Sequence, residues 1–207
     1  MSSKQKRMEE LTKRVSRCHL CPFSFHRQNI VMSAGSLTAR VGLLGEAPGE
    51  KEDANAEAFC GPAGRDMTNI MEDFAIKREM LYICNLLKCW PIGPFVAKRN
   101  ETPRPEWVRN CFPYLWEQLQ IVQPKLLVLT GQPASIWTLN LPKSTLMKNI
   151  VGRKGVFETF GPYKLDWEMK YIVMYHPAAA MHARNPDRKA KIVRNMRDTF
   201  HYVRGQL

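Results

Sequence analysis

The chain has 207 residues and carries 31 Lys and Arg against 19 Asp and Glu, which gives a formal charge of +12. This excess of positive charge predicts a polyanionic partner, and DNA is the first candidate. No apolar run approaches the roughly 18 residues of a membrane-spanning helix, and the Lys-rich start lacks the apolar segment of a signal peptide, so we expect a soluble intracellular protein, cytoplasmic or nucleoid-associated, with no membrane partner.

The first predicted element is an amphipathic helix over residues 4–17. Met8, Leu11 and Val15 form a thin apolar stripe at helical spacing among charged residues. The helix leads directly into Cys18 and Cys21 of "CHLC". Because a structural metal usually takes four protein ligands, this pair predicts half of a metal site.

The body of the chain alternates between buried strands and amphipathic helices. Four nearly continuous apolar runs, typical of strands buried on both faces of a parallel sheet, span residues 40–46, 80–85, 125–131 and 171–177. Apolar stripes at helical spacing cover residues 67–74, 107–119 and 193–203. A hairpin is expected over residues 155–170. The pattern predicts a single domain over residues 1–207 of the α/β class, a three-layer α/β/α sandwich around a central, mostly parallel four-stranded sheet.

Polar residues stand where three of the predicted strands end. Glu46 closes the first run, Asn85 the second and His176 the last. Taken singly, these residues are compatible with a solvated charge, a turn former and a strand cap. Ligands of open parallel sheets bind outside the carboxyl ends of the strands, so the three together predict a shared pocket.

Two loops between strands and helices are expected to border this pocket. "GEAPGEKED" (45–53) has glycines that permit close approach to a ligand, but it is neither a dinucleotide fingerprint nor a Walker loop. "AFCGPAG" (58–64) places Phe59 beside a Gly-Pro turn, and Pro62 suits a first helical position, so that backbone amides can face the pocket. We interpret Phe59 as a stacking surface rather than a core residue.

The remaining cysteines differ in what their positions predict. Cys84 lies inside a strand and points to the face opposite Asn85, so it is interpreted as a small core residue. Cys89 lies beyond the strand and is free to turn toward a metal. Cys111 occupies the apolar side of a helix, where packing and ligation are equally compatible. A set of Cys18, Cys21, Cys89 and Cys111 would tie the N-terminal helix to the domain, with either zinc or an iron-sulfur cluster.

The segments "CHLCPFSFHR", "GLLGEAPGEKED", "AFCGPAG", "YICNLLKC" and "YHPA" together resemble the family 4 uracil-DNA glycosylases, the iron-sulfur branch of that superfamily. They occur in the family's order from about residue 18 to the C-terminal helix. The resemblance implies a 4Fe-4S cluster on Cys18, Cys21, Cys89 and Cys111. It also implies hydrolysis of the N-glycosidic bond of uracil in DNA by base flipping, which leaves an abasic site for base excision repair.

The resemblance further implies a role for each pocket residue. Phe59 would stack on the flipped uracil, and Asn85 would read its N3-H and O4 edge. His176 would donate a hydrogen bond to uracil O2 as negative charge develops there. Glu46, with the backbone of Gly45 and Ala47, would hold the attacking water.

The sequence departs from the family pattern in three loops. Ala56 and Ala58 replace the usual Gly and Pro before the stacking Phe. The connection from Cys89 to Cys111 is longer than expected, and residues 90–105 contain no histidine. Because the branch that traps its product covalently has a histidine in this region, we predict turnover without a covalent adduct. The loop over residues 176–186 is two residues longer than in the family and is expected to wedge into DNA.

Basic residues in these loops predict contacts with DNA phosphates. Lys98, Arg99 and Arg184 are the principal candidates, with Arg104 and Arg188 beside them, although a run of charge can also be only a solvated face. The substrate would be single- or double-stranded DNA that contains uracil, and we expect a monomer. Two alternatives stay open: a catalytically weak iron-sulfur or zinc DNA-binding module of the same fold, and a zinc-bound DNA-binding domain that catalyses no reaction.

Overall fold

Four short runs of aliphatic residues form the centre of the sheet in the computed structural model, which describes residues 2–94 and 102–207. They are β2 (Val41–Gly45), β3 (Leu81–Asn85), β4 (Leu126–Thr130) and β8 (Lys170–Met174). All their residues are buried except Lys170. They pair in parallel in the order β3-β2-β4-β8, which confirms the strands and the direction predicted from the apolar runs.

The sheet has six strands rather than the predicted four, because a short antiparallel strand borders each edge. These strands are β1 (Ala34–Gly35), which pairs with β3, and β5 (Lys154–Val156), which pairs with β8. Only backbone pairing defines them, since neither contains a run of apolar residues. The predicted hairpin over 155–170 is divided: β5 joins the main sheet, while β6 (Thr159–Phe160) and β7 (Tyr163–Lys164) pair separately.

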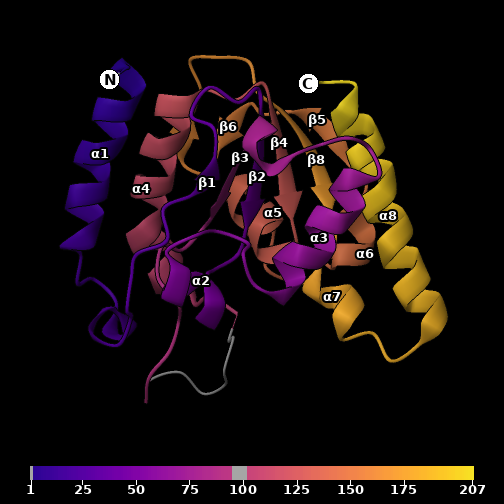
Figure 1. Cartoon of the computed structure of the whole chain (residues 1–207), viewed down its shortest axis with the longest axis horizontal. Coiled ribbons are helices and arrows are strands. Elements are labelled where there is room, and N and C mark those ends of the chain that lie inside the picture. The colour runs from indigo at the N-terminus through magenta and orange to yellow at the C-terminus, as the bar shows by residue number, and fades with distance from the viewer. Residues whose placement is uncertain (1, 95–101) are drawn as a thin grey trace.

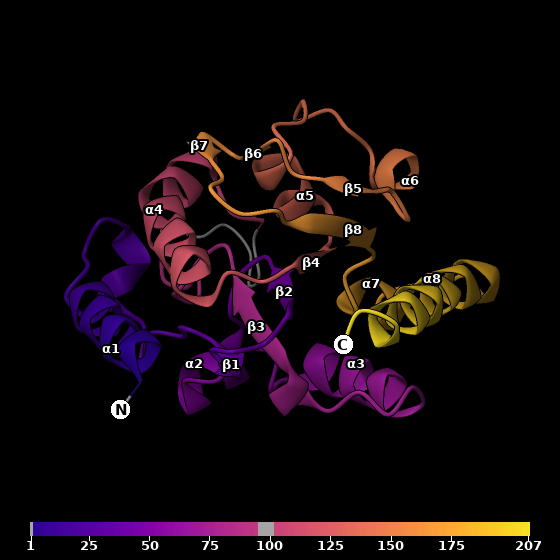
Figure 2. The ribbon, with the colours of Figure 1, turned by 90° about the horizontal axis from the view of Figure 1, so that it is seen from above.

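One face of the sheet is covered by α1 (Ser3–Ser16) and α4 (Pro105–Val122), which lie side by side in both views (Figures 1 and 2). Met8, Leu11 and Val15 are the buried residues of α1, as the apolar stripe predicted. They belong to the same apolar core as the inner face of α4. The N-terminal helix therefore docks through α4 onto the body of the protein.

The opposite face is covered by α3 (Pro62–Glu72) and α8 (Pro186–Arg204), so the sheet lies between two helical layers (Figure 2). Met67 and Met71 of α3 and Met196 and Phe200 of α8 are buried in a second apolar core. Both stripes were predicted from their spacing. The three-layer α/β/α architecture is thus confirmed.

The remaining helices are short. They are the 3-10 turns η1 (Pro22–Phe25) and η2 (Arg78–Met80) and the helices α2 (Glu50–Asn55), α5 (Gln132–Thr138), α6 (Met147–Ile150) and α7 (Ala178–Met181). Helices α2 and α7 both lie at the lower end of the molecule in Figure 1. In the described ranges, no helix combines the length and the apolar character needed to cross a membrane.

Candidate functional site

A cavity of about 620 Å³ opens where strands β2, β3 and β8 end. It is lined by Glu46 and Ala47 after β2, by Phe59 between α2 and α3, by Asn85 at the end of β3 and by His176 after β8. These are the pocket residues that the sequence predicted. The parallel sheet brings them together because it collects the carboxyl ends of its strands at one edge.

Gly45, the last residue of β2, lies directly beneath two of the lining side chains. A Cβ atom at this position would lie inside van der Waals contact with both Asn85 Oδ1 and the ring of Phe59. Only a residue without a side chain lets the amide and the ring approach each other above the strand. Gly45 therefore matters for its missing side chain as well as for its backbone.

Phe59 adopts an unusual backbone conformation. Its φ is 55°, in the left-handed region that residues with a Cβ atom rarely adopt. The residue is 5% exposed and belongs to the second apolar core as well as lining the cavity, so the prediction that it is not a core residue was wrong. The ring centroid lies 5.8 Å from that of His176, with 32° between the planes. A Cβ atom at Gly64 would collide with the Phe59 carbonyl, so the turn into α3 also requires glycine. The surrounding structure thus determines the position of this ring closely.

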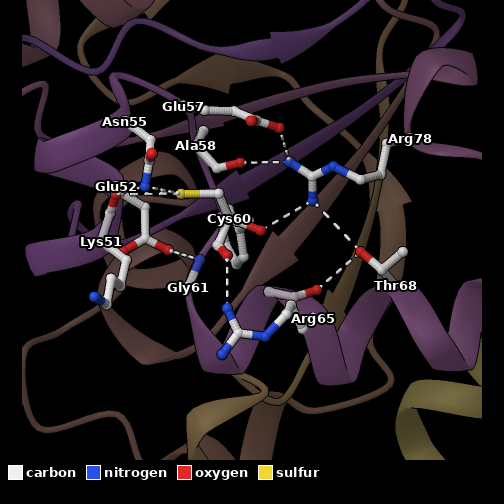
Figure 3. A network of polar contacts seen from close by, with 12 residues as sticks. Lys51, Glu52, Asn55, Glu57, Ala58, Cys60, Gly61, Arg65, Thr68 and Arg78 are labelled. Atoms are coloured by element: carbon white, nitrogen blue, oxygen red, sulfur yellow. Dashed lines mark hydrogen bonds and ion pairs between the residues drawn. The ribbon is translucent and has the colours of Figure 1, made fainter.

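Glu52 joins the two loops that border the cavity. Its Oε1 accepts the Gly61 N–H at 2.8 Å (Figure 3), and its Oε2 accepts the Gly49 N–H at 3.2 Å. Sequence reasoning did not identify Glu52. A usable signal was present, because a Glu at the third position of a helix commonly reaches back to the backbone at the helix start.

Asn85 is held from its backbone side by a buried lysine. The residue is 2% exposed, and its carbonyl accepts a hydrogen bond from Lys88 Nζ at 2.6 Å. The side chain lines the cavity beside Phe59. The backbone carbonyl of Asn85 is therefore already hydrogen-bonded, and its side-chain amide faces the cavity.

The two titratable pocket residues are shifted toward their neutral forms. Burial raises the pKa of the Glu46 carboxyl to about 7 and lowers the pKa of His176 to about 4. His176 Nδ1 accepts the Ala178 N–H at 3.2 Å. Because a neutral imidazole carries a single proton, this bond places the proton on Nε2. Near neutral pH, His176 is thus a neutral side chain with Nε2–H as its donor.

The four predicted cysteine ligands line a second cavity. Cys18, Cys21, Cys89 and Cys111 all border it, whereas Cys84 lies in the apolar core, as strand parity predicted. Arg27 Nη1 donates to Cys89 Sγ at 2.9 Å, and Asn110 Nδ2 donates to Cys21 Sγ at 3.8 Å. Within residues 2–94 and 102–207, no group of three His, Cys, Asp or Glu side chains is placed to hold a metal ion.

Lys88 lines the same cavity and is 0% exposed. In the described part of the chain, no carboxylate forms an ion pair with it. A buried ammonium group is costly unless an anion compensates its charge. Burial lowers the pKa of the Lys88 amine, and the nearby thiols of Cys84, Cys111 and Cys89 act in the opposite direction. An anionic neighbour would favour the charged ammonium form of this lysine, so four thiols beside a buried lysine are a donor set that fits an anionic metal centre.

The predicted DNA contacts are only partly described. Lys98 and Arg99 lie outside the described residues. Arg184 is exposed in the connection between α7 and α8, close in sequence to Met181 and His182, which line the first cavity. Arg184 and the cavity therefore belong to the same end of the molecule.

Comparison with known proteins gives matches over most of the chain. The family model described as the Uracil DNA glycosylase superfamily matches residues 32–197. The chain is 34% identical over 168 residues to a protein of Thermotoga maritima named Type-4 uracil-DNA glycosylase, which covers 78% of this chain and 84% of that protein. It is 31% identical over 177 residues to the protein of that name from Archaeoglobus fulgidus, covering 84% of this chain and 83% of the relative. The residues matched by the family model include Glu46, Phe59, Asn85 and His176.

Proposed function

The chain belongs to the uracil-DNA glycosylase superfamily, and from this premise we propose that it hydrolyses the N-glycosidic bond of uracil in DNA and leaves an abasic site for base excision repair. The observation that carries this proposal is the convergence of Glu46, Phe59, Asn85 and His176 on one cavity at the carboxyl edge of the sheet. The cavity has room for a base, and a base in DNA must be turned out of the stack to reach it.

Recognition of the base would depend on Phe59 and Asn85. The ring of Phe59 offers a flat apolar surface on which the flipped uracil can stack. The Asn85 amide offers a donor and an acceptor together, which match the O4 and N3-H edge of uracil. Cytosine presents these groups reversed, so the same fixed amide would reject it. The Phe59 ring and the Asn85 amide both lie next to the position that a Cβ of Gly45 would occupy, which supports a single site for both interactions.

Departure of the base would depend on His176. When the glycosidic bond breaks, negative charge develops on uracil, including at O2. A neutral imidazole with its proton on Nε2 can donate a hydrogen bond to that oxygen without giving up the proton. The buried position strengthens this electrostatic stabilisation, because a low dielectric screens it less than water does. The Ala178 N–H bond to Nδ1 keeps the ring in the required tautomer.

The attacking water would be held by Glu46 and by the backbone at Gly45 and Ala47. With a pKa of about 7, Glu46 is roughly half ionised at neutral pH and accepts a hydrogen bond from water in its ionised form. A sugar that gains positive charge as the base leaves needs a well-placed water more than a strong base. Positioning is therefore the role that we assign to Glu46.

The cluster is the second part of the proposal. We assign a 4Fe-4S cluster to Cys18, Cys21, Cys89 and Cys111, supported by their common cavity and by the buried lysine, Lys88, that also lines it. When bound, such a cluster would link the end of α1 to the segment after β3 and to α4. Arg27 and Asn110 would donate hydrogen bonds to its sulfur ligands.

Contacts to the DNA backbone would come from the loops at the same end of the molecule. Arg184 is the described candidate for a phosphate contact, and Lys98 and Arg99 are candidates from sequence alone. The chain would act on single- or double-stranded DNA as a monomer, and without a covalent adduct.

The direct test is incubation with uracil-containing single- and double-stranded oligonucleotides, followed by alkaline cleavage at abasic sites. Wild type should give strand scission at the uracil position only. Asn85→Ala and His176→Ala should each lower kcat/KM by about 10² to 10³, comparable with the loss of a polar transition-state contact elsewhere. Asn69→Ala, on the exposed side of α3, is the matched control and should act like wild type.

Three outcomes would contradict parts of this proposal. Bound oligonucleotide without scission would favour the alternative of a DNA-binding module. Near-normal excision by either variant would reject the role of that residue. A protein–DNA adduct that survives denaturation would contradict the prediction of turnover without covalent trapping.

A further inference from the structure

We infer that Arg78 is a positioning residue for base binding, because its guanidinium holds the backbone of the Phe59 loop in the conformation that presents the aromatic ring to the cavity. The inference rests on the proposed function in one respect, which is that Phe59 stacks on the base. Arg78 does not line the cavity. Its effect must therefore pass through Phe59.

The loop needs an external support because its conformation is locally unfavourable. Phe59 has φ 55°, and Ala56, three residues earlier, has the same positive value. Residues with a Cβ atom are strained in this region, so the chain occupies it only where other contacts compensate. Without such contacts, the loop would relax toward ordinary extended or helical backbone, and the ring of Phe59 would move with it.

Arg78 supplies these contacts to two consecutive residues (Figure 3). Its Nη2 donates to the Ala58 carbonyl at 2.6 Å, and its Nη1 donates to the Phe59 carbonyl at 3.0 Å. The Arg78 side chain is 17% exposed, so both bonds are largely shielded from water. Charge-assisted hydrogen bonds from one planar fork to two neighbouring carbonyls fix orientation as well as distance.

A carboxylate also binds the guanidinium, through the same nitrogen that donates to Ala58. Glu57 Oε1 accepts from Nη2 at 3.0 Å, but its side chain is 49% exposed. An exposed ion pair of this kind contributes little to stability. We therefore assign the positioning effect to the two carbonyl bonds and expect Glu57 to be dispensable.

The place of Arg78 in the fold explains how it can act as a fixed support. It begins η2, which runs directly into β3, and β3 ends at Asn85. One short segment thus has Arg78, which binds the backbone of the Phe59 loop, at one end and Asn85, which we propose to recognise the base, at the other. Because β3 is paired on both sides in the sheet, the distance between Arg78 and Asn85 is set by rigid structure.

The test compares Arg78→Gln and Arg78→Lys with two controls in the same network. Arg65→Gln removes an exposed guanidinium that donates to the Cys60 carbonyl at 3.2 Å, one residue beyond Phe59. Glu57→Gln removes the ion pair but keeps the carbonyl bonds. The measurements are kcat and KM on a uracil-containing single-stranded oligonucleotide and inhibition of the reaction by free uracil.

We expect Arg78→Gln to raise both KM and the inhibition constant of free uracil about ten-fold. This is the change expected if only about a tenth of the variant molecules hold the loop in the binding conformation, because the apparent affinity falls in proportion to that fraction. The value of kcat should change by less than about three-fold, since molecules at saturation have already selected that conformation. Arg78→Lys should resemble Arg78→Gln, because a single ammonium cannot replace the fork. Both controls should match wild type.

A double-mutant cycle separates positioning from general stability. If Arg78 acts through the ring, Arg78→Gln should have no further effect on uracil inhibition once Phe59→Ala has removed the ring. An equal loss in both backgrounds would overturn the inference, as would wild-type KM in Arg78→Gln. If Arg78→Gln does not fold, as judged by circular dichroism, Arg78→Lys, which keeps the charge, carries the same test. An inactive wild-type protein would instead reject the proposed function itself.

Discussion

At the scale of single residues, burial shifts the pKa values of the two ionisable pocket residues in opposite directions, and both shifts favour the uncharged form. Glu46 rises to a pKa of about 7 and His176 falls to about 4, so each favours its uncharged form. Between these two values, both side chains are neutral. The pocket can therefore receive a neutral base and stabilise the charge that appears on it during the reaction.

The shift of Glu46 predicts the pH dependence of the reaction. If the ionised carboxyl positions the water, kcat should rise with pH and level off above pH 7, while His176 stays neutral throughout the range from pH 5 to 9. Glu46→Gln should have a lower kcat, and this dependence should be absent from it. Initial rates over this pH range provide the measurement. A rise near pH 7 that persists in Glu46→Gln would assign the titration to another group.

The same shift has a consequence for stability that does not require substrate. The folded-state pKa of Glu46 lies above the reference value of 4.5, so the stability contributed by the protonated carboxyl is complete below pH 4.5 and is lost as pH rises through about 7. Glu46→Gln avoids this loss. Its Tm relative to wild type should therefore be higher at pH 8 than at pH 4.5.

The sequence was sufficient to predict the pocket residues at the strand ends, but not the residues that hold them in place. Glu46, Asn85 and His176 could be predicted to meet because parallel strands end at one edge. Arg78 and Lys88 act through backbone carbonyls and burial, which leave no pattern in neighbouring residues. Only the folded chain brings Arg78 within hydrogen-bond distance of a loop about 20 residues earlier.

At the scale of elements, three segments meet around the cysteine cavity. The connection between α1 and η1 provides Cys18 and Cys21, the segment after β3 provides Cys89, and α4 provides Cys111. The docking of α1 on α4 already buries its apolar stripe. A cluster would thus add a covalent link to an interface that packing alone has formed.

Two cysteine substitutions test this arrangement. Cys89→Ala should lose absorption near 400 nm after anaerobic purification, because one of four ligands is missing. Cys84→Ala removes a buried thiol that does not line the cavity, so it should keep the absorption at a stability cost of about 1 kcal/mol. Absorption spectra with iron and zinc analysis give the readout. A colourless wild-type protein that contains zinc would contradict the iron-sulfur assignment.

The strands and helices that could be predicted from the sequence are those that bury a continuous apolar face. Strands β2, β3, β4 and β8 and helices α1, α3, α4 and α8 each have an apolar run or stripe that reveals them. Strands β1 and β5 are two and three residues long and are partly exposed. Their formation depends on a partner strand at the sheet edge. No local periodicity could have predicted them.

At the scale of the whole molecule, the formal charge of +12 predicts how DNA binding depends on salt. Binding through phosphates releases counterions, so affinity should fall as the salt concentration rises, by a slope set by the number of phosphate contacts. Arg184→Ala should lower that slope by about one unit on a log–log plot, because it removes one contact. Fluorescence anisotropy with a labelled oligonucleotide between 50 and 200 mM salt measures it.

The matched control for this experiment is Lys6→Ala, in the first turns of α1. That end of α1 lies at the upper edge of the molecule in Figure 1, while α7, which precedes Arg184, lies at the lower edge. Removal of this charge should leave the slope unchanged. Equal changes in both variants would indicate that net charge, rather than a contact near the cavity, sets the salt dependence.

The absence of a side chain at Gly45 limits which substitutions this strand end can accept. Exchange of glycine for alanine often raises the stability of a protein where the backbone conformation suits both residues, because it reduces the conformational entropy of the unfolded chain. Here one added methyl group would occupy the space in which the amide and the aromatic ring meet. Gly45→Ala must therefore displace the Asn85 amide or the Phe59 ring, which are the two groups assigned to reading the base. A substitution that usually changes little would here disturb base recognition directly.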